Sequence, residues 1–220
     1  MMMPLLRRAC LLFFIPAVIT TAAFPESRQE QDLTIIPMIM EGRYQGASAT
    51  GVIDAPPGLV WKIISDYDGA DRFMPNIIES RAIRREENRV WTRTICGIGP
   101  FRVLFYARSI ERQEQGELAF QQLEGPFTKN RGSWTVRPME DGRTSLTYNI
   151  ELDHVLIPTR IRRHLLHKSL PGLFAAVRQR ALRLREAAKD RAAGKLSTAV
   201  ITVKPDQNPR KKNENPSRLP

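Results

Sequence analysis

Few residues of this 220-residue chain have types and spacing that could support chemistry: three histidines and, outside the N-terminal apolar run, one cysteine. His164 and His167 are three residues apart, so on a helix they would lie about one turn apart and could contact a common metal ion. Arg160, Arg163 and Lys168 crowd the same stretch and would repel a divalent cation, and no carboxylate or cysteine completes a four-ligand set. We therefore expect no metal and no cofactor.

The other candidates for proton transfer or nucleophilic attack are isolated. Successive side chains of a strand point to opposite faces, so the neighbours Asp153 and His154 would not cooperate. Cys96 has no histidine beside it to form a thiolate, which favours a small buried strand residue. Tyr148 with Arg93 would indicate catalysis only if the two converged inside a cavity with strongly perturbed titration. No catalytic residue is predicted.

The N-terminus has the three parts of an export signal. Two adjacent arginines form a positive flank, residues 9–19 form an apolar run, and small residues lead to an expected cleavage after Ala23. We therefore predict a signal peptide over residues 1–23 and a periplasmic location. An uncleaved membrane anchor stays open as the alternative. Cys96 would be the only cysteine of the mature chain, so no internal disulfide can form.

The framework that must position any site lies between residues 44 and 189. Seven segments bounded by turn residues have the patterning of antiparallel strands. The expected strands are residues 44–54, 77–84, 90–96, 101–111, 117–124, 131–139 and 144–154. Residues 24–43 are predicted to form a loose N-terminal segment, and residues 190–220 a basic, disordered tail.

Helical patterns follow the first and the last of these strands. Two prolines open an expected helix that ends near Asp66, because proline fits the first turn of a helix, and a short helical turn follows at residues 69–74. From Arg160 to Ala188, apolar residues recur at three- and four-residue steps, which is the spacing of one helix face. This order predicts an α+β fold with the helices on one face of an antiparallel sheet.

Several short motifs are similar to those of a known family. They are Asp54-Ala55-Pro56, Val60-Trp61, Asp66-Tyr67, Phe73-Met74-Pro75, Leu123-Glu124-Gly125-Pro126-Phe127 and Trp134. Over about residues 47–187 the chain resembles the START-like polyketide cyclase/dehydrase and lipid-transport proteins, most closely the coenzyme-Q-binding START-type domains. The resemblance implies a helix-grip fold, in which a curved antiparallel sheet of about seven strands wraps the long C-terminal helix and leaves an apolar cavity.

The expected lining of that cavity is the inward-facing set of strand and helix residues. Its members are Phe101, Val103, Phe105, Trp134, Leu146, Tyr148, Ile150, Phe174 and Val177. A mostly apolar wall of this kind suits a hydrophobic small molecule. From periodicity alone, the same residues could instead interlock as a dry core, and the resemblance favours the cavity.

The positive charge of the chain is concentrated at its C-terminal end. Residues 24–157 carry 16 Lys and Arg against 19 Asp and Glu, whereas residues 158–220 carry 16 against 4. The positive electrostatic field of residues 158–220 favours an anionic partner. The alternative is that these basic side chains only form a solvent-exposed surface. The basic cluster is the set Arg160, Arg163, His164, His167 and Lys168. It begins the long helix, and we predict that it touches an anionic membrane surface.

These observations predict an exported, non-catalytic protein that binds or transports a lipid, isoprenoid or polyketide-like molecule and touches the membrane reversibly. The alternative on the same scaffold is a cyclase, dehydratase or hydrolase acting on a hydrophobic substrate. Nucleic-acid binding is disfavoured by export and by the lack of aromatic residues among the basic ones. The sequence identifies neither the ligand nor the oligomeric state.

Overall fold

A computed structural model describes residues 33–98 and 101–193 of the chain. Within these ranges one sheet of eight strands has the order β1-β2-β8-β7-β6-β5-β4-β3, and every neighbouring pair is antiparallel. The strands are β1 (Leu33–Met40), β2 (Arg43–Ile53), β3 (Ile77–Glu86), β4 (Arg89–Ile98), β5 (Phe101–Arg112), β6 (Glu117–Glu124), β7 (Lys129–Pro138) and β8 (Thr144–Asp153).

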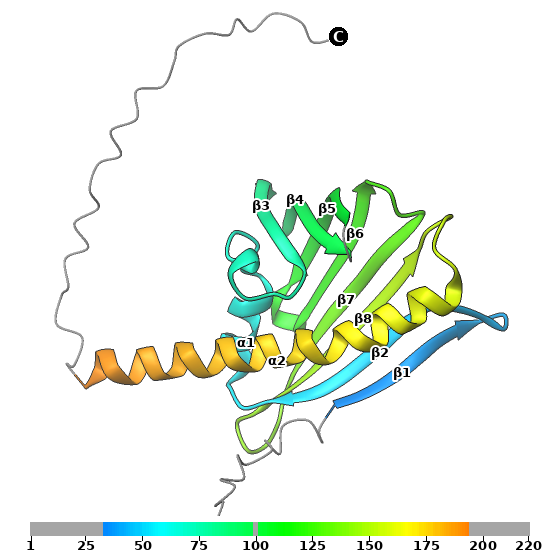
Figure 1. Ribbon diagram of the computed structural model, residues 1–220. Helices are drawn as coiled ribbons and strands as arrows, with labels where there is room; N and C mark the ends of the chain where they lie inside the picture. Colours follow the sequence, from blue (N-terminus) through cyan, green and yellow to red (C-terminus); the bar gives the residue numbers. More distant parts are fainter. Residues whose placement is uncertain (1–32, 99–100, 194–220) are drawn as a thin grey trace, which may run out of the picture.

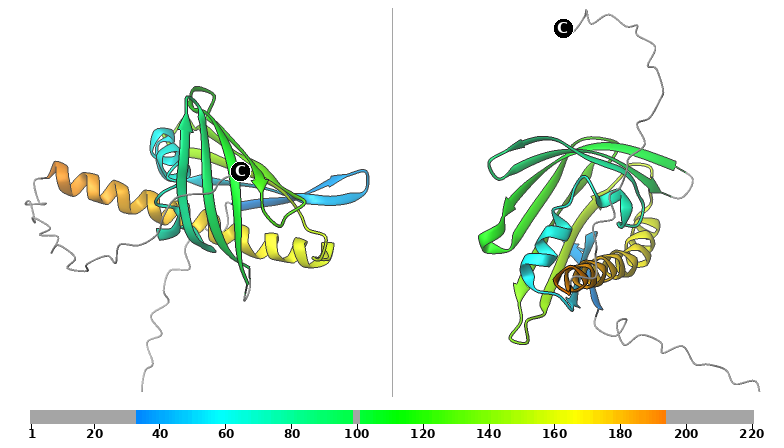
Figure 2. Two further views of the ribbon diagram at one scale, coloured as in Figure 1. Left: turned by 90° about the horizontal axis from the view of Figure 1, so that it is seen from above. Right: turned by 90° about the vertical axis from the view of Figure 1, so that its left-hand side faces the viewer.

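The helices lie mainly on one side of this sheet, as expected. They are α1 (Pro57–Ile64), the short 3-10 turns η2 (Ala70–Arg72) and η3 (Gln113–Gln115), and the long α2 (Thr159–Ala192). The sheet curves around α2, which crosses its concave face (Figures 1 and 2). The predicted α+β helix-grip fold is therefore confirmed.

Strand β1 corrects the prediction of a loose segment over residues 24–43 and of about seven strands. It pairs with β2 along its whole length and forms one edge of the sheet. Leu33 and Ile35 pack against the core, while Pro37 is tolerated because an edge strand does not need every backbone N–H for pairing. Residues 24–32 of the predicted segment and the predicted signal peptide lie outside the described residues.

Small residues on β2 allow α2 to lie close to the sheet. Ala47 and Ala49 are buried on the face that α2 covers. A Cβ atom at Gly51 would lie 3.0 Å from Phe174 Cδ1, which is closer than ordinary packing allows. Glycine at this position therefore lets the aromatic ring of α2 rest directly on the strand.

One face of α2 is buried at helical spacing, as the sequence predicts. Leu166, Leu170, Phe174, Val177 and Ala181 are the buried apolar residues of this helix. They recur every three or four residues and form the stripe that packs on the sheet. The helix ends at Ala192, a few residues beyond the predicted Ala188, and residues 194–220 lie outside the described part.

Arginines attach the second half of α2 to the elements beneath it. Arg178 Nε donates to the Val52 carbonyl at 3.0 Å. Arg185 contacts the Asp54 carboxylate at 3.0 Å, so part of the basic charge of α2 is used inside the fold. Within the described ranges, no helix combines the length and the apolar composition needed to cross a bilayer.

Candidate ligand-binding cavity

A cavity of about 310 Å³ lies between α2 and the concave face of the sheet. Its lining comes from α1, the segment between α1 and β3, strands β3 to β8 and the first half of α2. This volume is at the lower end of the range typical for small-molecule sites. The helix and the sheet thus leave the internal space that the family resemblance implied.

The two sides of this cavity differ in chemistry. The apolar wall comes from β7, β8 and α2 and comprises Trp134, Ile150, Leu166, Leu170 and Leu173, with Tyr148 among them. The hydroxyl wall comes from β3, β4 and β5 and comprises Ser80, Thr92, Thr94 and Ser109. The residues of the hydroxyl wall are only 3–7% exposed. Apolar side chains therefore predominate on one side, where Asn130 and Ser169 are polar exceptions, while the four buried hydroxyls gather on the other side beside Phe105 and Ala107.

Aromatic rings hold the apolar wall in shape. The ring centroids of Trp134 and Tyr148 are 4.2 Å apart, and Phe120 stacks on Tyr148 at 6.1 Å. Trp134 also contacts Phe174 of α2, with 6.4 Å between centroids. Because aromatic pairs at these separations attract each other beyond their burial, this wall is a fixed surface.

The described lining residues include no charged side chain. The two tyrosines of the lining could act as bases only after losing their phenolic protons, which a raised pKa disfavours. Burial raises the pKa of Tyr148 well above its ordinary value. Burial also raises the pKa of Tyr67, with the nearby Glu111 adding to the effect. Both phenols therefore stay protonated and neutral at physiological pH.

The structure places the predicted lining residues in four different environments. Phe105, Trp134, Tyr148 and Ile150 do line the cavity. Leu146, Phe174 and Val177 are instead fully buried in the hydrophobic core, because α2 lies directly on the sheet where these side chains meet. Val103 is half-buried on β5 and is not among the lining residues. Phe101 is 70% exposed, because it lies at the end of the β4–β5 hairpin, beyond the cover of α2.

Sequence reasoning missed the hydroxyl wall, although a signal for it was present. Thr92 and Thr94 alternate with outward-facing residues and share the parity of Val90, which is buried. Extending that parity along β4 would have placed both threonines inside. The segment before β3, with Met74, Pro75 and Asn76 at the cavity, was also missed, because a loop has no period to follow.

The ionisable pair that would have indicated catalysis does not converge. Arg93 pairs with Glu79 at 2.6 Å and is absent from the cavity lining, whereas Tyr148 lines it. Burial raises the pKa of the Cys96 thiol, which disfavours a reactive thiolate. Within the described ranges, no group of three or more His, Cys, Asp or Glu side chains could hold a metal ion.

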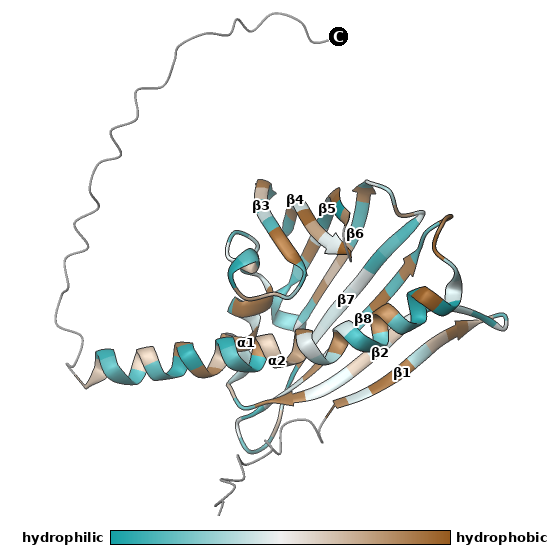
Figure 3. Cartoon of the chain, viewed as in Figure 1, coloured by the Kyte–Doolittle hydropathy of each residue, from teal (hydrophilic) through white to brown (hydrophobic). Residues whose placement is uncertain are grey.

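All five residues of the basic cluster are exposed at the beginning of α2. Apolar side chains lie among them: the apolar rim comprises Val155, Leu156, Ile161 and Leu165, all classed as exposed. Val155 and Leu156, in the turn between β8 and α2, are 81% and 82% exposed. Figure 3 shows this turn coloured as hydrophobic beside the hydrophilic face of the helix.

A buried arginine fixes that turn in place. Arg162 donates to the Leu152 carbonyl at 2.6 Å and to Thr159 Oγ1 at 3.0 Å, and it contacts the Asp153 carboxylate at 2.9 Å. The backbone N–H of Leu156 donates to His154 Nδ1 at 3.0 Å, so this imidazole has a structural role. The apolar rim therefore projects from an anchored base.

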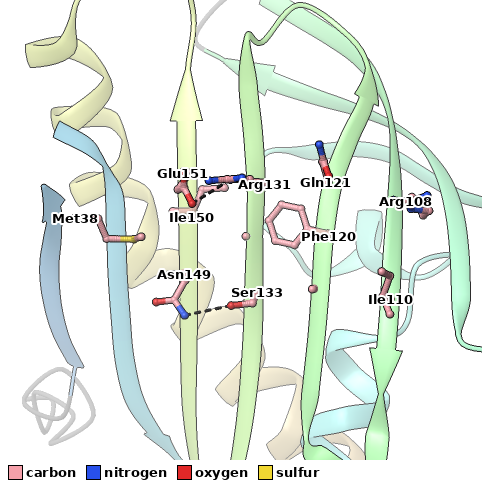
Figure 4. Close-up of a pocket in the computed structure, with 12 residues that line it drawn as sticks. Met38, Arg108, Ile110, Phe120, Gln121, Arg131, Ser133, Asn149, Ile150 and Glu151 are labelled. Carbon is pink, nitrogen blue, oxygen red and sulfur yellow. Dashed lines mark hydrogen bonds and ion pairs between the residues drawn. The ribbon is translucent and has the colours of Figure 1, made fainter. Parts of the chain in front are cut away.

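A second hollow, the outer groove, lies on the opposite face of the sheet (Figure 4) and was not predicted. It has a volume of about 440 Å³ and is lined by residues from β1, β5, β6, β7 and β8. Arg131 forms two hydrogen bonds to the Glu151 carboxylate, both of 3.0 Å, and Asn149 Nδ2 donates to Ser133 Oγ at 3.2 Å. These polar groups of the outer groove are therefore already partnered.

Comparison with known proteins agrees with this geometry. The profile of the family described as polyketide cyclase / dehydrase and lipid transport matches residues 53–178. No protein of curated function matches the chain. Human StAR-related lipid transfer protein 5 has a TM-score of 0.58 at 12% sequence identity, covering 72% of this chain and 86% of that one. The Zhui aromatase/cyclase from Streptomyces sp. R1128 has a TM-score of 0.53 at 17% identity, covering 73% and 96%. A STAR-related lipid transfer protein from Xanthomonas axonopodis has a TM-score of 0.55 at 15% identity, covering 68% and 93%.

These likenesses, together with the curved sheet around α2, define a START-like helix-grip fold. Because the matched profile spans more than half of the sequence, the chain belongs to the polyketide cyclase/dehydrase and lipid-transport family. The resemblance stated from the motifs is thereby confirmed at the level of the family. The closer likeness to coenzyme-Q-binding domains stays a prediction.

Proposed function

We propose that this protein binds and carries a hydrophobic small molecule, such as a lipid, isoprenoid or polyketide-like compound, without chemically changing it. The observation that carries the proposal is an internal cavity with an apolar wall and no charged side chain among the described lining residues. Burying apolar ligand surface there is favourable by roughly 25 cal/mol per Å². The neutral tyrosines and the separation of Arg93 from Tyr148 favour carriage over proton-transfer chemistry.

Fluorescence titration with the neutral dye Nile red tests this binding, with a matched pair of variants. Ala107 on β5 lines the inner cavity, and Ala119 on β6 lines the outer groove. Ala107→Phe should fill the inner cavity and weaken dye binding by about tenfold or more, whereas Ala119→Phe should leave it unchanged. Equal binding by both variants would contradict the proposed site.

The proposal includes reversible contact with an anionic membrane through the basic cluster and the apolar rim. Each basic side chain near such a surface contributes on the order of 1 kcal/mol, and the rim adds apolar area that can enter the headgroup region. Burial raises the pKa of the Tyr44 phenol at the start of β2, and the nearby charges of Arg163 and Arg162 oppose that effect. The proposed contact surface is thus the end of the molecule where α2 begins.

Co-sedimentation with vesicles of phosphatidylcholine, with and without phosphatidylglycerol, tests the contact. The variant Arg160→Gln/Arg163→Gln should lose binding to the anionic vesicles, and high salt should have the same effect on the wild type. Its control is Arg183→Gln/Arg191→Gln, which removes the same charge from exposed positions in the second half of α2. A loss of equal size in both variants would mean that only net charge matters.

A second pair of variants tests the apolar rim. Val155→Ser/Leu156→Ser should weaken binding to the same vesicles, because two of the most exposed apolar side chains are removed. The control Leu182→Ser changes an exposed leucine farther along α2 and should bind like the wild type. If the rim variant binds as well as the control, the contact is purely electrostatic and the rim has no part in it.

The proposal also includes export, with removal of residues 1–23 as its expected step. Its support is the order of positive flank, apolar run and small residues in the sequence. Intact-mass measurement of the protein from the periplasmic and membrane fractions tests it. A chain that begins at Phe24 in the periplasm is expected, and a full-length chain retained in the membrane would instead indicate an anchor.

A further inference from the structure

The hydroxyl wall of the inner cavity is unusual because three adjacent strands each bury hydroxyl side chains on the same side. Ser80 of β3 is the cross-strand partner of Thr94, and Thr92 lies two residues before Thr94 on β4. Val90, which shares the parity of these threonines, pairs with Ser109 of β5. The four hydroxyls therefore occupy one continuous patch, opposite the apolar wall.

These hydroxyls have few partners inside the protein. Thr92 Oγ1 reaches the Ala107 carbonyl only at 3.5 Å, the outer limit of a hydrogen bond. The hydroxyls of Ser80 and Thr94 make no side-chain hydrogen bond within residues 33–98 and 101–193. Ser109 differs, because it faces the Tyr67 hydroxyl closely enough to lower the pKa of that phenol, against the larger opposing effect of burial. Polar groups enclosed by a protein are normally hydrogen-bonded, so Ser80, Thr92 and Thr94 have unused hydrogen-bonding capacity for a ligand.

The chemistry of the patch also limits what can bind it. A hydroxyl can donate one hydrogen bond and accept others, so it suits an alcohol or a carbonyl oxygen. A carboxylate or phosphate would need a cation to offset its burial, and the described lining residues include no Lys, Arg or His. A pure hydrocarbon would leave the hydroxyls unpartnered. The group that fits is therefore polar and uncharged.

We propose that the ligand is a neutral amphiphile whose alcohol or carbonyl head bonds to the hydroxyl wall and whose hydrocarbon part lies against the apolar wall. This inference rests on the proposed function, because it names the chemical class of molecule that the same cavity holds. The hydroxyl wall then determines specificity, while the apolar wall contributes most of the affinity.

Three fluorescent probes of the same ring system test this assignment: pyrene, 1-pyrenemethanol and 1-pyrenecarboxylate. The wild type should bind 1-pyrenemethanol about tenfold more tightly than either of the others. In Thr92→Val/Thr94→Val, which keeps the side-chain shape, 1-pyrenemethanol should lose that advantage while pyrene binds as before. Ser80→Ala is a second, milder variant in case the double variant does not fold.

The matched control is Thr135→Val/Thr147→Val on the outer face of the sheet, which should change the affinity for none of the probes. Equal affinity for all three probes in every variant would overturn the inference while hydrophobic binding stands. Tightest binding of 1-pyrenecarboxylate would also overturn it. If no probe binds and Ala107→Phe leaves Nile red binding unchanged, the proposed function itself fails, and this inference with it.

Discussion

The inner cavity and the outer groove lie on opposite faces of the same sheet and differ in an instructive way. The outer groove is larger, at about 440 Å³ against about 310 Å³. The outer groove is lined by the charged side chains of Arg108, Arg131 and Glu151, whereas the described lining of the inner cavity contains no charged side chain. Volume alone therefore does not identify a site for a hydrophobic molecule, and the uncharged lining is what favours the inner cavity.

The largest expected effect concerns the core that supports the inner cavity. Phe174→Ala should lower the free energy of unfolding by about 3–5 kcal/mol, because the ring is fully buried between α2 and β2. Phe101→Ala should change it by less than about 0.5 kcal/mol, since that ring is exposed. Urea unfolding of both variants measures the difference. If both variants lose a similar free energy of unfolding, the Phe101 side chain is buried in solution and its exclusion from the cavity lining is wrong.

The next effect concerns the clamp that holds the beginning of α2. Arg162→Met should lower the free energy of unfolding by about 1–3 kcal/mol, because it leaves the Leu152 carbonyl and Asp153 without their partner. The neighbouring Arg163→Met removes an exposed charge and should cost little. Thermal unfolding compares the two. If Arg163→Met is the more damaging change, the basic cluster is structural and its proposed role at the membrane loses support.

The smallest effect belongs to the outer groove. The hydrogen bonds from Arg131 hold the pKa of Glu151 below its ordinary value. Stability from this pair is therefore present above the pKa of the unfolded carboxyl and is lost as pH falls through the lower pKa of the folded one. We expect no more than about 1 kcal/mol, because the pair lies near the surface.

Glu151→Gln tests that effect through the pH dependence of unfolding. The difference in stability between wild type and variant should be small near neutral pH and vanish in acid. A difference that grows in acid would contradict the direction of the pKa shift. A loss of Nile red binding in this variant would bring the outer groove back as the ligand site.

The strands and the long helix could be predicted because their side chains follow a regular period. Leu170, Phe174 and Val177 recur at helical steps, and β8 alternates as expected. Strand β1 escaped prediction because Pro37 interrupts it and its apolar residues Ile36, Ile39 and Met40 are exposed. An edge strand of this kind is defined by its partner β2 rather than by its own pattern.

The candidate site was only partly predictable from the sequence. The spacing of apolar residues shows which face of a strand or helix is buried, but it does not show whether a buried side chain meets the cavity or the packed core. Parity placed Tyr148 and Ile150 inside correctly, but it also placed Leu146 in the lining, where α2 fills the space. Knowing which inward residues meet a cavity requires the place at which α2 crosses the sheet. The threonines of β4 were overlooked because hydroxyl side chains are usually found on the solvent face of a strand.

The central claim is that the inner cavity holds a hydrophobic molecule, and its most direct test is to identify what the protein carries. The wild type, Ala107→Phe and Ala119→Phe would be purified from the organism that encodes the protein and extracted with organic solvent for mass spectrometry. We predict one dominant neutral lipid-like compound, near equimolar with the wild type and with Ala119→Phe and lost from Ala107→Phe. An extract without such a compound, or one that Ala107→Phe retains in full, would contradict the account.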